Sequence, residues 1–265
     1  MSPLLSDYPR YALQMLRGDR STGERAQMQG LLRDVAPLVD LSRPRDILDV
    51  ANGRLQPQYT LLKGAGHRVY GIDYVNRPTQ SLTDAAYVVA RGLYRAQAGV
   101  GLLEPPRRRT LVCGDVGRLP FPAASFDLAV SAAAFEHFLD VPAVVADLHR
   151  VLRPGAVAWI AVHLFTCVTG GHNLTFTYPL PQTFPEADLW DHLRQRRRPF
   201  TVPLNEWRTN QYVAEFTRHF EVLKVYCRGR EGEHLLTPAI EAELAAYTRD
   251  ELTCGQLVII ARKRA

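Results

Sequence analysis

The sequence contains no apolar run long enough to span a bilayer. The best candidate, AVAWIAVHLFTCV from Ala156, falls short of the ~18 residues that a spanning helix needs, and it includes His163. The N-terminal stretch carries scattered charges and no apolar core, so we expect no secretory signal, no membrane span and a cytoplasmic protein. The composition, 46% hydrophobic and 22% charged, excludes a disordered or fibrous chain.

Cysteine and lysine are scarce. The four cysteines, Cys113, Cys167, Cys227 and Cys254, are far apart, and no pair has the C-x-x-C spacing of a zinc or redox site. We therefore expect reduced, mostly structural thiols and no bound metal. Only three of the 32 basic residues are lysines, and the net charge of +5 is too modest to indicate a nucleic-acid partner.

Several enzyme motifs are missing as well. The chain has no HExxH zinc motif, no GxxxxGK[ST] phosphate loop and no GxGxxG dinucleotide fingerprint. Zinc-enzyme and nucleoside-triphosphatase functions are therefore unsupported. A nicotinamide-dependent oxidoreductase ranks last among the functions that we consider.

Short apolar runs alternate with helical patterns through the middle of the chain. Strands alternating with helices predict βαβ units and a parallel sheet. The expected strands are Asp46–Ala51, Arg68–Asp73, Thr110–Asp115, Phe126–Ala132 and Ala156–Val162. The expected helices between them are Gln56–Gly64, Gln80–Gln97 and Val141–Leu152.

The pattern continues at both ends of the chain. A capping box at Ser21–Glu24 predicts the start of an N-terminal helix. Near the other end, Asn205 is placed to cap a helix that runs to His219. The runs Phe220–Cys227 and Cys254–Lys263 predict the last two strands.

Four sequence motifs in this order resemble the class I S-adenosylmethionine-dependent methyltransferases, and most closely their UbiE-like small-molecule branch. The motifs are ILDVANGRL from Ile47, VYGIDYV from Val69, CGDVGRLPFPAASFDLAVSAAAFEHF from Cys113 and LHRVLRPGAVAWIAV from Leu148. The resemblance implies an α/β, Rossmann-like, doubly wound sheet of seven strands in the order 3-2-1-4-5-7-6, with strand 7 antiparallel. It also implies S-adenosylmethionine as cofactor and methyl transfer to a small-molecule acceptor.

The resemblance further divides one methyltransferase-like domain, residues 1–265, into four parts. An N-terminal helical segment (1–45) precedes the cofactor-binding core (46–162), and a lid insertion (163–205) follows the fifth strand. The C-terminal part (206–265) holds the last helices and strands 6 and 7.

By the same resemblance, cofactor contacts fall at the ends of four strands. Ligands of such sheets sit at the carboxyl ends of the strands. Asp73 would accept hydrogen bonds from both ribose hydroxyls, and Asp115 from the adenine amino group. Asp49 would either orient the first loop or reach the amino group of the methionine part. The implied set is Asp49, Ala51, Asn52, Gly53, Asp73, Tyr74, Asp115, Val116 and Ser131.

The glycine-rich loop of this family is degenerate here. Its usual pattern is close to G-x-G-x-G, whereas this chain has Ala51-Asn52-Gly53-Arg54-Leu55. Leu55 either narrows the pocket or begins the next helix early, and Arg54 brings a cation close to the expected sulfonium. The alternative function is therefore an inactive binding or scaffold protein of the same fold.

Two histidines are the candidate catalytic residues, His137 after the fourth strand and His163 after the fifth. His137 is equally a packed, hydrogen-bonded histidine, and His163, like His172, is a candidate for polar contact with the acceptor. In the insertion, the aromatic side chains either form an acceptor wall or pack the lid onto the core. The run Arg194, Arg196, Arg197 and Arg198 either binds an acidic group of the acceptor or forms a solvated face. The aromatic residues are Phe176, Tyr178, Phe184 and Trp190.

Overall fold

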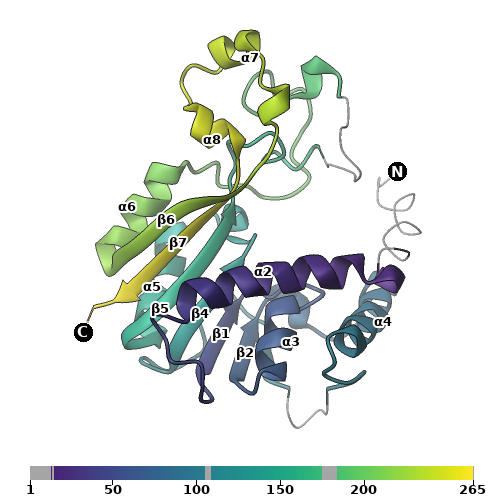
Figure 1. Ribbon diagram of the computed structural model, residues 1–265, viewed down its shortest axis with the longest axis vertical. Coiled ribbons are helices and arrows are strands. Elements are labelled where there is room, and N and C mark those ends of the chain that lie inside the picture. Colours follow the sequence, from purple (N-terminus) through teal and green to yellow (C-terminus); the bar gives the residue numbers. More distant parts are fainter. Residues whose placement is uncertain (1–12, 14, 105–108, 175–183, 265) are drawn as a thin grey trace. The chain divides into compact units, whose positions relative to one another are not determined.

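The computed structural model describes residue 13 and residues 15–104, 109–174 and 184–264 (Figure 1). Seven strands form one sheet in the order β3-β2-β1-β4-β5-β7-β6, and β7 pairs antiparallel with β6. The predicted α/β fold and strand order are confirmed. The strands are β1 Asp46–Val50, β2 Arg68–Ile72, β3 Leu111–Val112, β4 Phe126–Ala132, β5 Leu152–His163, β6 Phe220–Arg230 and β7 Cys254–Lys263.

Helices connect most of the strands. The α-helices are α2 Asp19–Val35, α3 Pro57–Gly64, α4 Leu82–Gln97, α5 Val141–Val151, α6 Thr209–His219, α7 Pro238–Glu243 and α8 Arg249–Thr253. Short 3₁₀ turns are η1 Tyr74–Asn76, η3 Phe135–His137, η4 Glu186–Asp188 and η5 Glu233–Leu235. Within the described part of the chain, no helix is long and apolar enough to cross a membrane.

The chain divides into two compact units. Unit 1 consists of Met1–Val130 with Val151–Val157, and unit 2 of Ser131–Arg150 with Ala158–Ala265. In unit 1, β1 pairs in parallel with both β2 and β4, and Ile47 opposes Val69 on one side and Leu128 on the other. All three side chains are buried, which explains why these strands have nearly continuous apolar sequences.

Unit 2 has a hydrophobic core of its own. Helix α6 packs on β6 and β7. The predicted insertion packs against the connection between those two strands, so the insertion is an integral part of this core. The cluster comprises Val168, Leu189, Trp190, Leu236, Ile240, Leu244 and Leu252, with Phe184 packed against it.

Two predicted helix starts are wrong. Helix α2 begins at Asp19, and its N-cap is Gly18 in a left-handed conformation rather than Ser21. The N-cap of α6 is Arg208. Asn205 lies before the helix: its side-chain amide donates to the carbonyl oxygens of Phe135 and Phe138 at 2.7 and 2.9 Å, and its Oδ1 accepts from the Trp207 backbone amide at 3.0 Å.

The prediction of four reduced cysteines is also wrong. Cys227 and Cys254 form a disulfide, with their Cα atoms 5.6 Å apart. The antiparallel register of β6 and β7 pairs Arg230 with Cys254, which brings Cys227 close to the same end of the ladder. Cys113 and Cys167 are free thiols, exposed and buried respectively.

Candidate functional site

The loop after β1 keeps a glycine-like conformation although it has only one glycine. Ala51, Gly53 and Gln56 all have positive φ angles, of 54°, 65° and 58°. The Ala51 amide donates to the carbonyl oxygen of Ile72 at 2.8 Å, which holds the turn against β2. Left-handed backbone strains a residue that carries a Cβ. The strained turn therefore persists where the sequence has lost its glycines.

Asp73 ties this loop to the end of β2. Its Oδ2 accepts from the Gly53 amide, and its Oδ1 from the Val75 amide, each at 2.9 Å. A carboxylate oxygen has two lone pairs, so each oxygen keeps one acceptor position. A Cβ built on Gly53 would meet no heavy atom within 4 Å, so the space beside the loop is open.

The Asn52 side chain links the loop after β1 to the residues that follow β2. It is buried, and its Oδ1 accepts from the side-chain amide of Asn76 at 2.9 Å. Asn76 also donates to the carbonyl oxygen of Val112 at 3.0 Å, so it joins the loops after β1 and β2 to the end of β3. A side chain at Gly71 would lie 2.8 Å from Asn52 Oδ1, so glycine is required there. We did not identify Asn76 from the sequence. In the sequence, its position three residues after Asp73 is the one feature that could have indicated this role.

Asp49 is almost fully buried, with 1% of its surface exposed. Its Oδ2 accepts from the Tyr59 amide at 2.9 Å, in the first turn of α3. Burial raises the pKa of Asp49 from its usual 3.8 to about 7. This geometry favours the loop-orienting role over direct contact with a ligand.

Arg54 does not leave a free cation beside the loop. Its guanidinium forms an ion pair with Asp84 of α4. It also lies over the ring of Tyr87, 5.6 Å from the ring centroid. Leu55 is buried in the loop and does not begin a helix, since α3 starts at Pro57.

The ends of β2 and β3 place polar groups next to the loop. Tyr74 is 61% exposed, and its pKa is raised by desolvation and by the Asp115 carboxylate. Asp115 is exposed, and its Oδ1 accepts from the Gly117 amide at 2.8 Å. The Val116 side chain is buried. Unit 1 therefore presents two carboxylates and an open loop at the carboxyl ends of adjacent parallel strands.

In unit 2, the two predicted catalytic histidines lie on either side of His172. The centroid of the His172 ring is 4.9 Å from that of His137 and 5.1 Å from that of His163. His137 Nδ1 is 2.9 Å from the carbonyl oxygen of Pro203, and Nε2 is 3.8 Å from a carboxylate oxygen of Glu136. Glu136 is buried, which raises the pKa of its carboxyl group.

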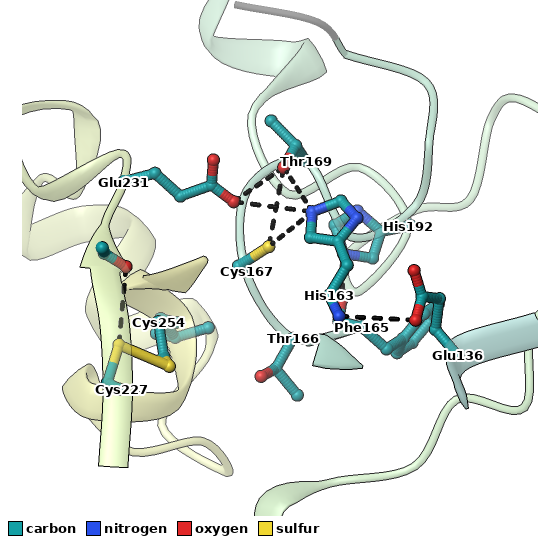
Figure 2. A network of polar contacts seen from close by, with 12 residues as sticks. Glu136, His163, Phe165, Thr166, Cys167, Thr169, His192, Cys227, Glu231 and Cys254 are labelled. Atoms are coloured by element: carbon teal, nitrogen blue, oxygen red, sulfur yellow. Dashed lines mark hydrogen bonds and ion pairs between the residues drawn. A yellow bond between two sulfur atoms is a disulfide. The ribbon is translucent and has the colours of Figure 1, made fainter. Parts of the chain in front are cut away.

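His163 lies within a tighter polar network, shown in Figure 2. Its Nε2 is 2.8 Å from Thr169 Oγ1 and 3.7 Å from Glu231 Oε1. Its backbone amide donates to Glu136 at 3.4 Å. Hydrogen bonding and charge from Glu231 raise the pKa of His163, although burial opposes the change.

Comparison with known proteins shows which family the core of the chain resembles. Residues 48–160 match a family described as a methyltransferase domain. This part of the chain is a class I S-adenosylmethionine-dependent methyltransferase domain. S-adenosylmethionine is the methyl donor of this family, as the sequence predicted.

Individual relatives of this methyltransferase match part of their length. Demethylmenaquinone methyltransferase from Geobacillus stearothermophilus is 26% identical over 127 residues, which are 47% of this chain and 48% of that protein. Nocamycin O-methyltransferase from Saccharothrix syringae is 32% identical over 122 residues, 44% of this chain and 38% of that protein. The match thus covers less than half of either curated relative.

A solved structure shares the fold over most of the methyltransferase. The S-adenosylmethionine dependent methyltransferase from Mesorhizobium loti aligns with a TM-score of 0.54 and 18% identity. The alignment covers 87% of this chain and 96% of that one.

The polar groups of unit 1 suit the methyl donor chemically. Its ribose hydroxyls and adenine amino group are hydrogen-bond donors, and Asp73 and Asp115 are acceptors. The open side of Gly53 leaves room for a ligand to approach the backbone. Ser131, in contrast, is fully buried in β4 and offers no exposed surface.

The insertion of the methyltransferase is more tightly packed than the sequence suggested. Trp190 is fully buried and donates from Nε1 to the carbonyl oxygen of Leu252 at 3.2 Å, so it packs the core. Phe176 and Tyr178 lie outside the described residues. The predicted arginine run is paired with acidic residues: Arg194 with Glu243, Arg196 with Glu206, Arg197 with Asp191 and Asp188, and Arg198 with Asp188.

Proposed function

We propose that the protein transfers a methyl group from S-adenosylmethionine to a small-molecule acceptor. The observation that carries this proposal is the Asp73 carboxylate, which binds the Gly53 and Val75 amides and keeps free acceptor positions. The left-handed conformation of Ala51 adds support, because the loop retains its shape despite the lost glycines. The names of the curated relatives, which describe methyltransferases of demethylmenaquinone and nocamycin, support a small-molecule acceptor.

Each predicted cofactor residue has a distinct task under this proposal. Asp73 accepts from the ribose hydroxyls, and Asp115 from the adenine amino group, with the Val116 amide beside it. Gly53 lets the cofactor approach the backbone. Asp49, Ala51 and Asn52 shape the loop, and Tyr74 flanks the adenine.

The side chains need to supply little of the chemistry of methyl transfer. S-adenosylmethionine supplies an activated methyl group, so the protein has mainly to align the acceptor. A base is needed where the acceptor must lose a proton. His137 is the better candidate, because the Pro203 carbonyl can accept a hydrogen bond from Nδ1–H, and the one group beside Nε2 among the described residues is the Glu136 carboxylate at 3.8 Å. His163 already has Thr169 and Glu231 at its Nε2.

A labelled transfer assay tests this function. The protein is incubated with S-adenosylmethionine carrying a radioactive methyl group and a panel of hydroquinones, phenols and carboxylic acids. We expect label in at least one extracted acceptor, and a loss of at least about tenfold in rate for His137→Ala where that acceptor carries a proton to be removed. Stoichiometric binding of the cofactor with no transfer to any acceptor would favour the scaffold alternative.

A further inference from the structure

In unit 2, three side chains of types that commonly bind metal ions lie close together, and none of them belongs to the predicted cofactor-binding set. They are His163 at the end of β5, Cys167 in the turn that follows, and Glu231 just after β6 (Figure 2). His163 Nε2 lies 3.4 Å from Cys167 Sγ and 3.7 Å from Glu231 Oε1. One ligand atom from each residue lies within 4.8 Å of the others.

The two separations measured from His163 Nε2 match those of ligands that share one tetrahedral zinc. Zinc bonds of about 2.0–2.3 Å at tetrahedral angles place two ligand atoms roughly 3.3–3.7 Å apart. Thiolate, imidazole and carboxylate are the three ligand types that zinc takes in proteins. We propose that His163, Cys167 and Glu231 bind a zinc ion, which ties the turn after β5 to the end of β6.

The geometry is not that of an activated nucleophile. In a catalytic triad, the nucleophile and the carboxylate bind opposite nitrogens of the imidazole. Here both the thiol and the carboxylate face Nε2. Cys167 is also fully buried, so its sulfur is closed to a substrate.

A metal-free explanation exists and makes a different prediction. The Thr169 hydroxyl is 2.8 Å from His163 Nε2 and donates to Glu231 Oε1 at 2.7 Å. This chain of hydrogen bonds would by itself hold the histidine and the glutamate together. In the zinc site, a water molecule completes the coordination, so Thr169→Ala keeps the metal.

A second group lies next to this one. Glu136, His137 and His172 also offer converging ligand atoms, and His172 Nε2 is buried without a hydrogen-bond partner. This group has no sulfur ligand, and it contains the proposed base. We therefore assign the metal to the group with Cys167, and the experiment separates the two.

The test uses the full-length protein, stripped with a chelator and titrated with Zn²⁺ or Co²⁺. We expect about one metal per chain, and a thiolate-to-cobalt charge-transfer band in the Co²⁺ form, which requires a sulfur ligand. This band is read on the unaltered protein, so the result does not depend on a variant that folds. Methyl transfer is not needed for it, so its failure is distinct from failure of the proposed function.

Variants then locate the ion. Cys167→Ser, His163→Gln and Glu231→Gln should each weaken Zn²⁺ binding by about 100-fold or more, whereas Cys113→Ser, which alters the exposed free thiol, should not. No metal uptake, or Co²⁺ binding without the thiolate band, would overturn the proposal. So would loss of the metal in His172→Ala together with its retention in Cys167→Ser.

Discussion

Replacing Asp73 with asparagine probes the proposed cofactor site most sharply. Asparagine has nearly the same size but no charge, and one of its two acceptor oxygens becomes an amide donor. The amide can no longer accept from both Gly53 and Val75, nor from two ribose hydroxyls. Hydrogen bonds to a charged group contribute about 1.5–3 kcal/mol. At about 1.4 kcal/mol per factor of ten, the dissociation constant should rise about 10- to 150-fold.

Calorimetric titration with S-adenosylhomocysteine, the demethylated product, measures this change directly. Thermal unfolding without ligand serves as the control for folding, because one lost backbone hydrogen bond should cost only about 0.5–1.5 kcal/mol. Asp40→Asn is the matched variant, since Asp40 also accepts a backbone hydrogen bond, from Ser42, but lies in an exposed turn. An Asp73→Asn affinity within a factor of two of the unaltered protein would refute the role assigned to this carboxylate.

Three further predictions concern stability. Ala51→Gly should raise the free energy of unfolding by up to about 1 kcal/mol in urea titrations, because glycine adopts the left-handed conformation of residue 51 without strain. A lower free energy of unfolding would contradict the inference that Ala51 is strained. Asp49→Asn should stabilise the ligand-free protein above pH 7, by up to about 4 kcal/mol, because a raised folded-state pKa makes stability fall as pH rises from 3.8 to about 7. That advantage should vanish as the pH of the urea titrations falls toward 3.8, and a pH-independent effect would refute it. Reducing the Cys227–Cys254 disulfide, which closes a 27-residue separation, should cost about 3.5 kcal/mol, and a Cys227→Ser, Cys254→Ser double variant should no longer respond to reductant.

Strands were the most predictable part of the fold. The predicted bounds of β4 and β7 coincide with the observed ones, because each strand is built around a largely buried apolar run. The strand order came from the family resemblance rather than from periodicity. Helix starts were less predictable, since Asn205 Oδ1 accepts from the Trp207 backbone amide as a cap would, yet α6 begins only at Thr209.

The missed contacts join residues that are far apart in the sequence. Arg54 looked like a free cation, because its partner Asp84 lies 30 residues away on α4. Trp190 donates to Leu252, 62 residues further on, which no local pattern reveals. His163 and Glu231 contact each other only because unit 2 brings the ends of β5 and β6 together.

The central claim, that this methyltransferase binds S-adenosylmethionine through the loops after β1 and β2, is tested most directly by titrating the unaltered protein with that cofactor in a calorimeter. We predict one saturable site per chain, from which S-adenosylhomocysteine displaces the cofactor competitively. Absence of saturable heat up to millimolar cofactor, from a protein that unfolds cooperatively, would contradict the account.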